Sequence, residues 1–445
     1  MAEQDGGRLS AEEIVELSKR YTLFDWVAQS KVSPFPIASA SGVYFTGADG
    51  KRYLDFNSQL MSVNAGHGDA RIADAVARQV RELAYVSSAG MTTEVRALLG
   101  RKLAELFPGD IEKSFFTLAG ADANENAIRI ARAVTGRQKI LARYRSYHGA
   151  TAGAITLTGE PRRWANEPGI GGVVHVLDFY HGTTRPSDDA AEALTLLQET
   201  IELEGPTTIA AFILEPVTGT NGILIPPDGY LQGVRELCDR YGILLIADEV
   251  MSGFGRTGAW FAVDHWGVVP DLITCAKGLT SSYVPLGAVG LRPQVAEHFE
   301  DHPFSGGLTY NSHPVALAAA LATIRVYEED GLVEHAKKMG EVMRGHHEDL
   351  AARHPSVGAF RNIGLFGCLE LVRNRATGEP MAPFNSSSPE MAALLSSMLD
   401  QGVYVSLHWN QVMTNPPLCI TEAQLAEGFA ALDQALEITD RAVVG

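Results

Sequence analysis

Two apolar segments of the chain each end in side chains that can do chemistry. The first, Ile243–Ala247, is followed at once by Asp248 and Glu249. The second, Leu272–Cys275, is followed after one alanine by Lys277. In open α/β sheets, ligands bind just beyond the carboxyl ends of the strands. A lysine partly removed from water at such a place has a lowered amine pKa, which makes the amine a usable nucleophile toward an aldehyde.

An acid and a lysine at two strand ends match what pyridoxal 5′-phosphate requires. The lysine forms an imine with the aldehyde, and the carboxylate keeps the ring nitrogen protonated so that the ring accepts electrons. Each residue alone has an ordinary explanation, because strand-end aspartates often cap helices and lysines often serve as solvated surface charges. The pair, taken with the two segments described next, favours a catalytic role for Lys277 and a cofactor-binding role for Asp248.

Two further strand ends carry groups that suit a phosphorylated aromatic ligand. Gly120 and Ala121 follow the apolar segment 115–118 and open a predicted helix, whose first N–H groups and dipole can bind a phosphate. Tyr147 follows the segment 139–142, and an aromatic ring at a strand end can stack on a flat heterocycle. Taken alone, the first segment is also explained by helix capping and the second by a core or surface tyrosine.

The order of the elements predicts an α/β fold. Short apolar runs without alternation, typical of strands buried on both faces, alternate with amphipathic helical patterns through the middle of the chain. We expect a hairpin over 43–56, a helix over 11–27, a strand over 361–372, and helices over 332–353 and from Thr421 onward. The last part of the chain therefore resembles a smaller, separate domain.

Several motifs resemble the class III, or ω-amino acid, branch of the pyridoxal-phosphate-dependent aminotransferases. Within that branch the chain resembles the taurine–pyruvate aminotransferases and related ω-transaminases. The motifs run in family order across nearly the whole chain: AGADANENA (119–127), YHG (147–149), ILEPV (213–217), ADEVMSGFGRTG (247–258), CAKGL (275–279), GLTYNSHPVALAAAL (307–321) and NPPLCIT (415–421).

The resemblance implies a role for each matching residue and assigns no metal ligand. Lys277 carries the cofactor as a Schiff base and then moves the proton, while Asp248 pairs with the ring nitrogen. Val250 and Tyr147 pack on opposite faces of the ring. The remaining assignments are Gly120 and Ala121 on the phosphate, Thr309 of the neighbouring subunit on the same phosphate, and Glu215 beside the ring.

The resemblance also implies the architecture of fold-type I pyridoxal-phosphate enzymes. We expect a large cofactor-binding domain over 70–330 with a mostly parallel sheet flanked by helices. A smaller α+β domain would be built from both chain ends, 1–69 and 331–445. Because Thr309 is expected to serve the neighbouring site, the implied assembly is a homodimer with shared active sites, or a tetramer built from such dimers.

The implied reaction moves an amino group from an ω-amino acid, a taurine-like compound or a simple primary amine to a 2-oxo acid such as pyruvate, through pyridoxamine phosphate. An aminomutase, racemase or decarboxylase would use the same lysine and aspartate, so these alternatives stay open. A dinucleotide-dependent oxidoreductase is a remote alternative. Its G-x-G-x-x-G pattern occurs at 253–258, but no strand leads directly into it and no helix period follows.

One segment departs from the family pattern. Many ω-transaminases carry an arginine shortly before the PPL motif, where it receives the acceptor's carboxylate, whereas this chain reads Val-Ser-Leu-His-Trp-Asn over 405–410. His408 would bind an anion more weakly than a guanidinium at neutral pH. Arg162 and Arg163 are other candidates for binding an anion, although loop arginines more often serve as surface charges.

Charge and hydropathy limit the partners. The net charge of −17 disfavours a nucleic acid or an anionic membrane surface as a partner. The longest apolar run, 314–324, is too short to span a bilayer, and the first residues lack the pattern of a secretory signal. We therefore expect a cytoplasmic enzyme that acts on small molecules.

Overall fold

The computed structural model describes residues 9–177, 179–181, 185–186 and 190–444. Its centre is a seven-stranded sheet in the order β4-β12-β11-β10-β9-β5-β6. Strands β11, β10, β9, β5 and β6 are parallel, and β12 is antiparallel to both of its neighbours. The bounds are β4 Lys113–Thr117, β5 Lys139–Arg143, β6 Val173–Val176, β9 Ile209–Leu214, β10 Leu244–Asp248, β11 Leu272–Cys275 and β12 Gly287–Leu291.

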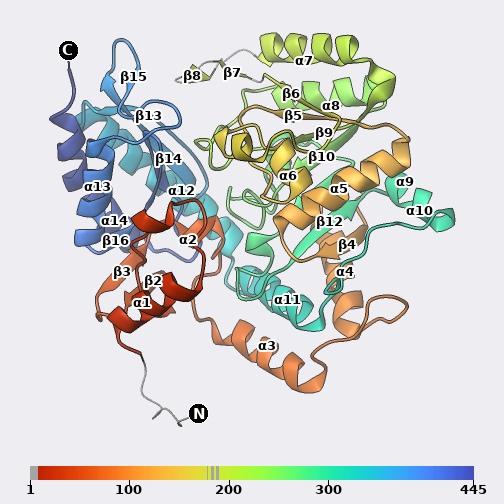
Figure 1. The fold of residues 1–445 in the computed structure, drawn as a ribbon, viewed down its shortest axis with the longest axis horizontal. Helices are drawn as coiled ribbons and strands as arrows, with labels where there is room; N and C mark the ends of the chain where they lie inside the picture. Colours follow the sequence, from red (N-terminus) through yellow and green to blue (C-terminus); the bar gives the residue numbers. More distant parts are fainter. Residues whose placement is uncertain (1–8, 178, 182–184, 187–189, 445) are drawn as a thin grey trace.

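Helices cover both faces of this sheet, which explains why its strands are apolar without alternation. On β10, Leu245 belongs to the same buried cluster as Val234 of α8 (Tyr230–Tyr241). The next residue, Ile246, belongs to a different cluster with Ile130 of α5 (Gly120–Thr135). Figure 1 shows α8 and α7 (Ala190–Glu204) on one side of the strands and α5 on the other. The predicted α/β class is confirmed.

A smaller α+β domain joins the two chain ends, as expected. Its first sheet pairs β1, β2 and β3 with β16, and β16 runs parallel to β3. Its second sheet has the order β13-β14-β18-β17, with β15 beside β14. Figure 1 shows the N-terminal segments in red next to the C-terminal ones in blue. The bounds are β1 Ile37–Ser41, β2 Tyr44–Gly47, β3 Arg52–Asp55, β13 Val357–Ile363, β14 Phe366–Asn374, β15 Glu379–Pro380, β16 Val403–Tyr404, β17 Ser406–His408, β18 Gln411–Thr414, α12 Leu332–Arg353, α13 Pro389–Asp400 and α14 Glu422–Asp440.

The remaining helices and strands lie outside the three sheets described above, and β7 and β8 pair as a separate two-stranded sheet. They are α1 Ala11–Tyr21, α2 Ser58–Met61, α3 Ala70–Glu82, α4 Glu94–Leu106, α6 Ala152–Leu157, β7 Tyr180–His181, β8 Arg185–Pro186, α9 Pro293–Ala296, α10 His298–Asp301 and α11 Pro314–Glu329. In the described part of the chain, no helix has the length and apolar character needed to cross a membrane. The exact limits of the two domains stay a prediction.

Two expected elements differ from the structure. Helix α1 ends at Tyr21 rather than continuing to residue 27, because the backbone is already extended at Thr22. The expected single strand over 361–372 is a hairpin, since Gly364 adopts a φ of 56° and turns β13 back into β14. Glycine tolerates this left-handed conformation at little cost, and the continuous apolar character of the segment concealed the turn.

Candidate active site

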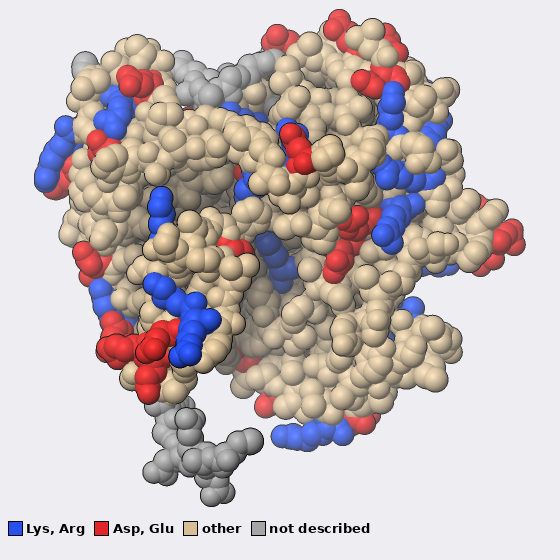
Figure 2. Space-filling model, viewed as in Figure 1, with Lys and Arg blue, Asp and Glu red and all other residues tan. Residues whose placement is uncertain are grey.

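One cavity of about 490 Å³ collects nearly all the predicted site residues. Its wall includes Gly120, Ala121, Tyr147, Glu215, Asp248, Val250 and Lys277. These residues lie beyond the carboxyl ends of β5, β9, β10 and β11 and at the start of α5. Figure 2 shows the same face of the molecule hollowed between its two domains, with Lys or Arg atoms inside the hollow. The fold therefore brings together predicted site residues that lie far apart in the sequence.

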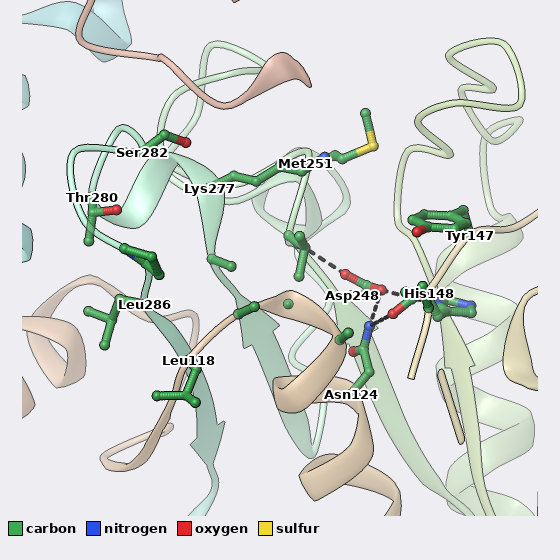
Figure 3. A pocket seen from close by; sticks show the side chains of 18 of the residues that line it. Leu118, Asn124, Tyr147, His148, Asp248, Met251, Lys277, Thr280, Ser282 and Leu286 are labelled. Atoms are coloured by element: carbon green, nitrogen blue, oxygen red, sulfur yellow. Dashed lines mark hydrogen bonds and ion pairs between the residues drawn. The ribbon is translucent and has the colours of Figure 1, made fainter. Parts of the chain in front are cut away.

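Asp248 is fixed by hydrogen bonds on both of its oxygens. Asn124 Nδ2 and His148 Nδ1 each lie 2.7 Å from Asp248 Oδ2, and the backbone N–H of Val250 donates to Oδ1 at 3.1 Å. Because Thr274 donates its hydroxyl to Asn124 Oδ1, the amide nitrogen of Asn124 must point toward the carboxylate. Figure 3 shows this network at the base of the cavity. These donors hold the Asp248 carboxylate in one orientation at the cavity.

The second carboxylate at this strand end has a structural role. Glu249 is fully buried, accepts hydrogen bonds from Ser252 Oγ and from the backbone of Val263, and is absent from the cavity wall. Burial raises the pKa of Glu249 to about 7. Of the two adjacent carboxylates, Asp248 is therefore the one that lines the cavity.

Lys277 reaches into the cavity from the turn that follows β11. Desolvation lowers the pKa of its amine to about 8, and the nearby charges of Glu215 and Asp248 oppose that shift. In Figure 3 the side chain extends across the cavity above Asp248. An amine with this pKa has a far larger neutral fraction near physiological pH than an ordinary lysine, and the neutral form is the nucleophile.

This pKa predicts how the free protein takes up an aldehyde. The rate at which the apoprotein binds pyridoxal phosphate should rise with pH and level off above about 8, because the neutral amine dominates above its pKa. Stopped-flow absorbance across pH 6 to 10 measures this rate. A rate that keeps rising toward pH 10 would show that the lysine retains the pKa of an exposed amine.

The start of α5 forms a cradle suited to a phosphate. Its N-cap residue, Ala119, makes no side-chain capping bond, so the first N–H groups of the helix stay available. A methyl group on Gly120 would lie 2.7 Å from Val250 Cγ1, and one on Gly149 would lie 2.5 Å from the Ala121 side chain. The backbone at Gly120 and Gly149 therefore lies too close to its neighbours for a larger side chain at either position. The N-terminal end of the helix dipole faces the cavity.

Glu215 closes the cavity beside Lys277. It is 3% exposed, and the backbone N–H groups of Tyr147 and Gly219 donate to its two oxygens at 3.0 and 2.9 Å. Burial raises the pKa of Glu215. This side chain holds the loop that carries Tyr147 in place.

Arg162 is not part of the cavity wall, but it contacts Tyr147, which is. Its guanidinium carbon is 3.9 Å from the centre of the Tyr147 ring and 5.4 Å from that of Trp26. Its charge is close enough to Lys277 to contribute to the lowered pKa of that amine. Arg163 instead pairs with Glu167. Of the two arginine candidates, Arg162 is the one that contacts a residue of the cavity wall.

His408 and Thr309 lie outside the cavity wall. His408 approaches Glu160 at 3.4 Å, and burial together with the charges of Arg162 and Arg145 lowers its pKa to about 4. Thr309 is exposed, and its carbonyl oxygen accepts a hydrogen bond of 2.7 Å from the Tyr85 hydroxyl. The role of Thr309 in a neighbouring subunit stays a prediction.

Sequence reasoning assigned no role to Asn124 and His148, although both stand inside the motifs it used. Asn124 follows Gly120 by one helical turn, and a polar residue on an otherwise apolar helix face signals a specific contact. His148 is adjacent to Tyr147, and no sequence pattern indicates that its ring turns toward Asp248.

These groups fit pyridoxal phosphate. The cavity supplies an amine of lowered pKa, an anchored carboxylate, an aromatic ring and a helix start with free N–H groups. These match the aldehyde, the ring nitrogen, the ring face and the phosphate of that cofactor.

Comparison with known proteins gives the same result. The family described as aminotransferase class-III matches residues 27–436. A taurine–pyruvate aminotransferase of Bilophila wadsworthia is 34% identical over 96% of this chain and 98% of its own length. A probable aminotransferase of Mycobacterium tuberculosis is 39% identical over 83% of this chain and 81% of its own length.

A solved structure resembles this one closely along the whole chain. The taurine:2-oxoglutarate aminotransferase of Bifidobacterium kashiwanohense, in complex with pyridoxal phosphate and glutamate, superposes with a TM-score of 0.95. It is 40% identical and covers 98% of this chain and 100% of its own. The chain described here therefore belongs to the class III aminotransferases and is a pyridoxal-phosphate-dependent enzyme.

Proposed function

We propose that this enzyme transfers an amino group from a small primary amine that carries an acid group, such as taurine or an ω-amino acid, to a 2-oxo acid such as pyruvate. The observation that carries the proposal is the guanidinium of Arg162, held 3.9 Å from the Tyr147 ring at the cavity. A guanidinium is the side chain best suited to a carboxylate or sulfonate. The names of the relatives from Bilophila and Bifidobacterium support the same class of donor.

The guanidinium of Arg162 has capacity left for a ligand. Its Nε pairs with Glu160 and its Nη2 donates to Thr220 Oγ1 at 3.1 Å. Nη1 makes no hydrogen bond to any described residue, and the side chain is 26% exposed. This arrangement leaves donors for the acid group while Tyr147 and Trp26 fix the plane of the cation.

The remaining residues divide the chemistry among them. Bound pyridoxal phosphate supplies an aromatic ring that takes up the electron pair released when the C–H bond of the substrate breaks. Lys277 holds the cofactor through Nζ and, once displaced by the donor amine, carries the proton on the same atom. Asp248 holds a proton on the ring nitrogen, and the backbone of Gly120 and Ala121 binds the phosphate. Val250 and Tyr147 confine the ring between them.

Two further proposals concern the assembly of the enzyme and its place in the cell. Thr309 of a second copy would complete the phosphate site, which makes the active form a homodimer. The enzyme would act in the cytoplasm, on small molecules alone.

Removing the guanidinium should raise the KM of donors that carry an acid group but not the KM of donors that lack one. Replacing Arg162 by Gln should raise the KM for taurine and β-alanine about 10–100-fold, the effect of losing one hydrogen bond between charged groups. The KM for propylamine should stay nearly unchanged, because that amine has no acid group. Initial rates with pyruvate and with 2-oxoglutarate measure both values. Equal KM changes for all three amines would contradict the proposed function, because the acid group would then not meet Arg162.

The alternatives that share the cofactor make different products. An aminomutase or racemase would return an isomer of the donor, and a decarboxylase would release carbon dioxide. Only transfer consumes one 2-oxo acid per amine and yields a new amino acid. Mass spectrometry of the products, with ¹⁵N in the donor, distinguishes these reactions.

A further inference from the structure

A buried carboxylate accompanies Arg162. Glu160 is 2% exposed and forms an ion pair with Arg162 Nε from the residue just before the short helical turn Pro161–Asn166. A buried charge is costly unless it is paired. In the resting pocket the pair is therefore close to neutral, and the guanidinium is balanced before any substrate arrives.

The other oxygen of this carboxylate makes no hydrogen bond. Glu160 Oε2 lies 3.4 Å from His408 Nε2, and in the described part of the chain neither atom has a hydrogen-bond partner. His408 comes from β17 of the smaller domain, and its ring packs on Trp409 at 4.1 Å between centroids. Because its surroundings keep His408 neutral, Arg162 is the only cation paired with Glu160 among the described residues.

An aminotransferase must receive two different substrates in one pocket. A donor such as taurine brings an anion to Arg162, whereas a simple amine such as propylamine brings an apolar end. An unpaired cation beside an apolar group is unfavourable, and a cation already fully balanced binds an anion poorly.

We propose that Glu160 is a positioning residue that sets the preference between acid-bearing and acid-free substrates, because it balances Arg162 whenever the substrate does not. This inference rests on the proposed function, since it requires that Arg162 meet the acid group of the substrate. Glu160 should weaken the binding of acid-bearing substrates and strengthen the binding of acid-free ones. Damage to the fold would impair both kinds of substrate together.

Glu160→Gln tests this balance while keeping the shape of the side chain. The amide oxygen can still accept from Arg162 Nε, and the amide nitrogen can donate to a His408 Nε2 lone pair, so the variant should fold. In the holoenzyme, the KM for taurine should fall and the KM for propylamine should rise. The ratio of the two kcat/KM values should shift about tenfold toward taurine, in keeping with the coupling of close charge pairs.

Calorimetry with ethanesulfonate gives a readout independent of turnover. This anion has the sulfonate of taurine but no amine, so it binds without reacting. Its Kd for holoenzyme should fall about tenfold in Glu160→Gln. The matched control is Glu167→Gln, which removes the carboxylate of the neighbouring exposed pair with Arg163 and should change neither quantity.

The possible outcomes separate the two proposals. If Arg162→Gln weakens taurine selectively but Glu160→Gln leaves the Kd of ethanesulfonate unchanged or raised, the role of Glu160 is wrong and the proposed function stands. If both KM values in Glu160→Gln move in the same direction, the residue is merely structural. If Arg162→Gln spares taurine, the proposed function itself fails.

Discussion

Replacing Lys277 by alanine should abolish turnover, with kcat reduced at least about 10⁴-fold, the upper range for loss of one proton-transferring group. The amine is the nucleophile and the proton carrier of the site, and none of the other lysines lines the described cavity wall. The variant should also lose the visible absorbance of a covalently held cofactor. Both effects follow from one atom, Nζ.

The loss should not reflect misfolding. Lys277 has a φ of 43°, a left-handed conformation that costs lysine and alanine about the same. The melting temperature of the apoprotein should therefore change little. Lys113→Ala, an exposed residue on β4 whose amine pairs with Glu300, is the matched control and should keep full activity. Residual turnover of Lys277→Ala above a few per cent would contradict the assignment of Lys277.

The central sheet and the main pair of site residues could be predicted from the sequence for one physical reason. Strands covered on both faces must be apolar, so a charged residue that ends such a strand stands out. The edge of the sheet where parallel strands end is also where ligands bind. Lys277 and Asp248 stand out in this way, and the structure places both on one cavity.

Other features depend on contacts between distant segments and leave no local pattern. Arg162 reads as an ordinary loop arginine, and only the folded chain places it on the Tyr147 ring. The turn at Gly364 lies within a continuous apolar run, so the sequence pattern there does not distinguish a hairpin from a single strand. The carboxylates of Asp248 and Glu249 are adjacent in sequence, and only the folded chain shows that Asp248 lines the cavity while Glu249 bonds the backbone of Val263.

Asp248→Asn should lower kcat about 10²–10³-fold, the range seen when a pre-oriented electrostatic contact is removed from an active site. A neutral amide cannot hold a proton on the ring nitrogen, so the ring becomes a weaker acceptor of electrons. Binding of the cofactor should survive, because Lys277 and the phosphate cradle are untouched. Steady-state rates and cofactor titration separate the two effects.

The substitution also has a structural cost that needs its own control. Asp248 accepts from Asn124 and His148 on one oxygen and from the Val250 backbone on the other, so an amide nitrogen must face a donor on either side. This mismatch should lower stability by about 1–3 kcal/mol. Glu249→Gln alters a neighbouring buried carboxylate that also accepts two hydrogen bonds, but outside the cavity. It should lower the melting temperature without a comparable loss of kcat. If Glu249→Gln reduced turnover as much as Asp248→Asn, the effect would come from the packing of β10 rather than from a carboxylate at the ring nitrogen.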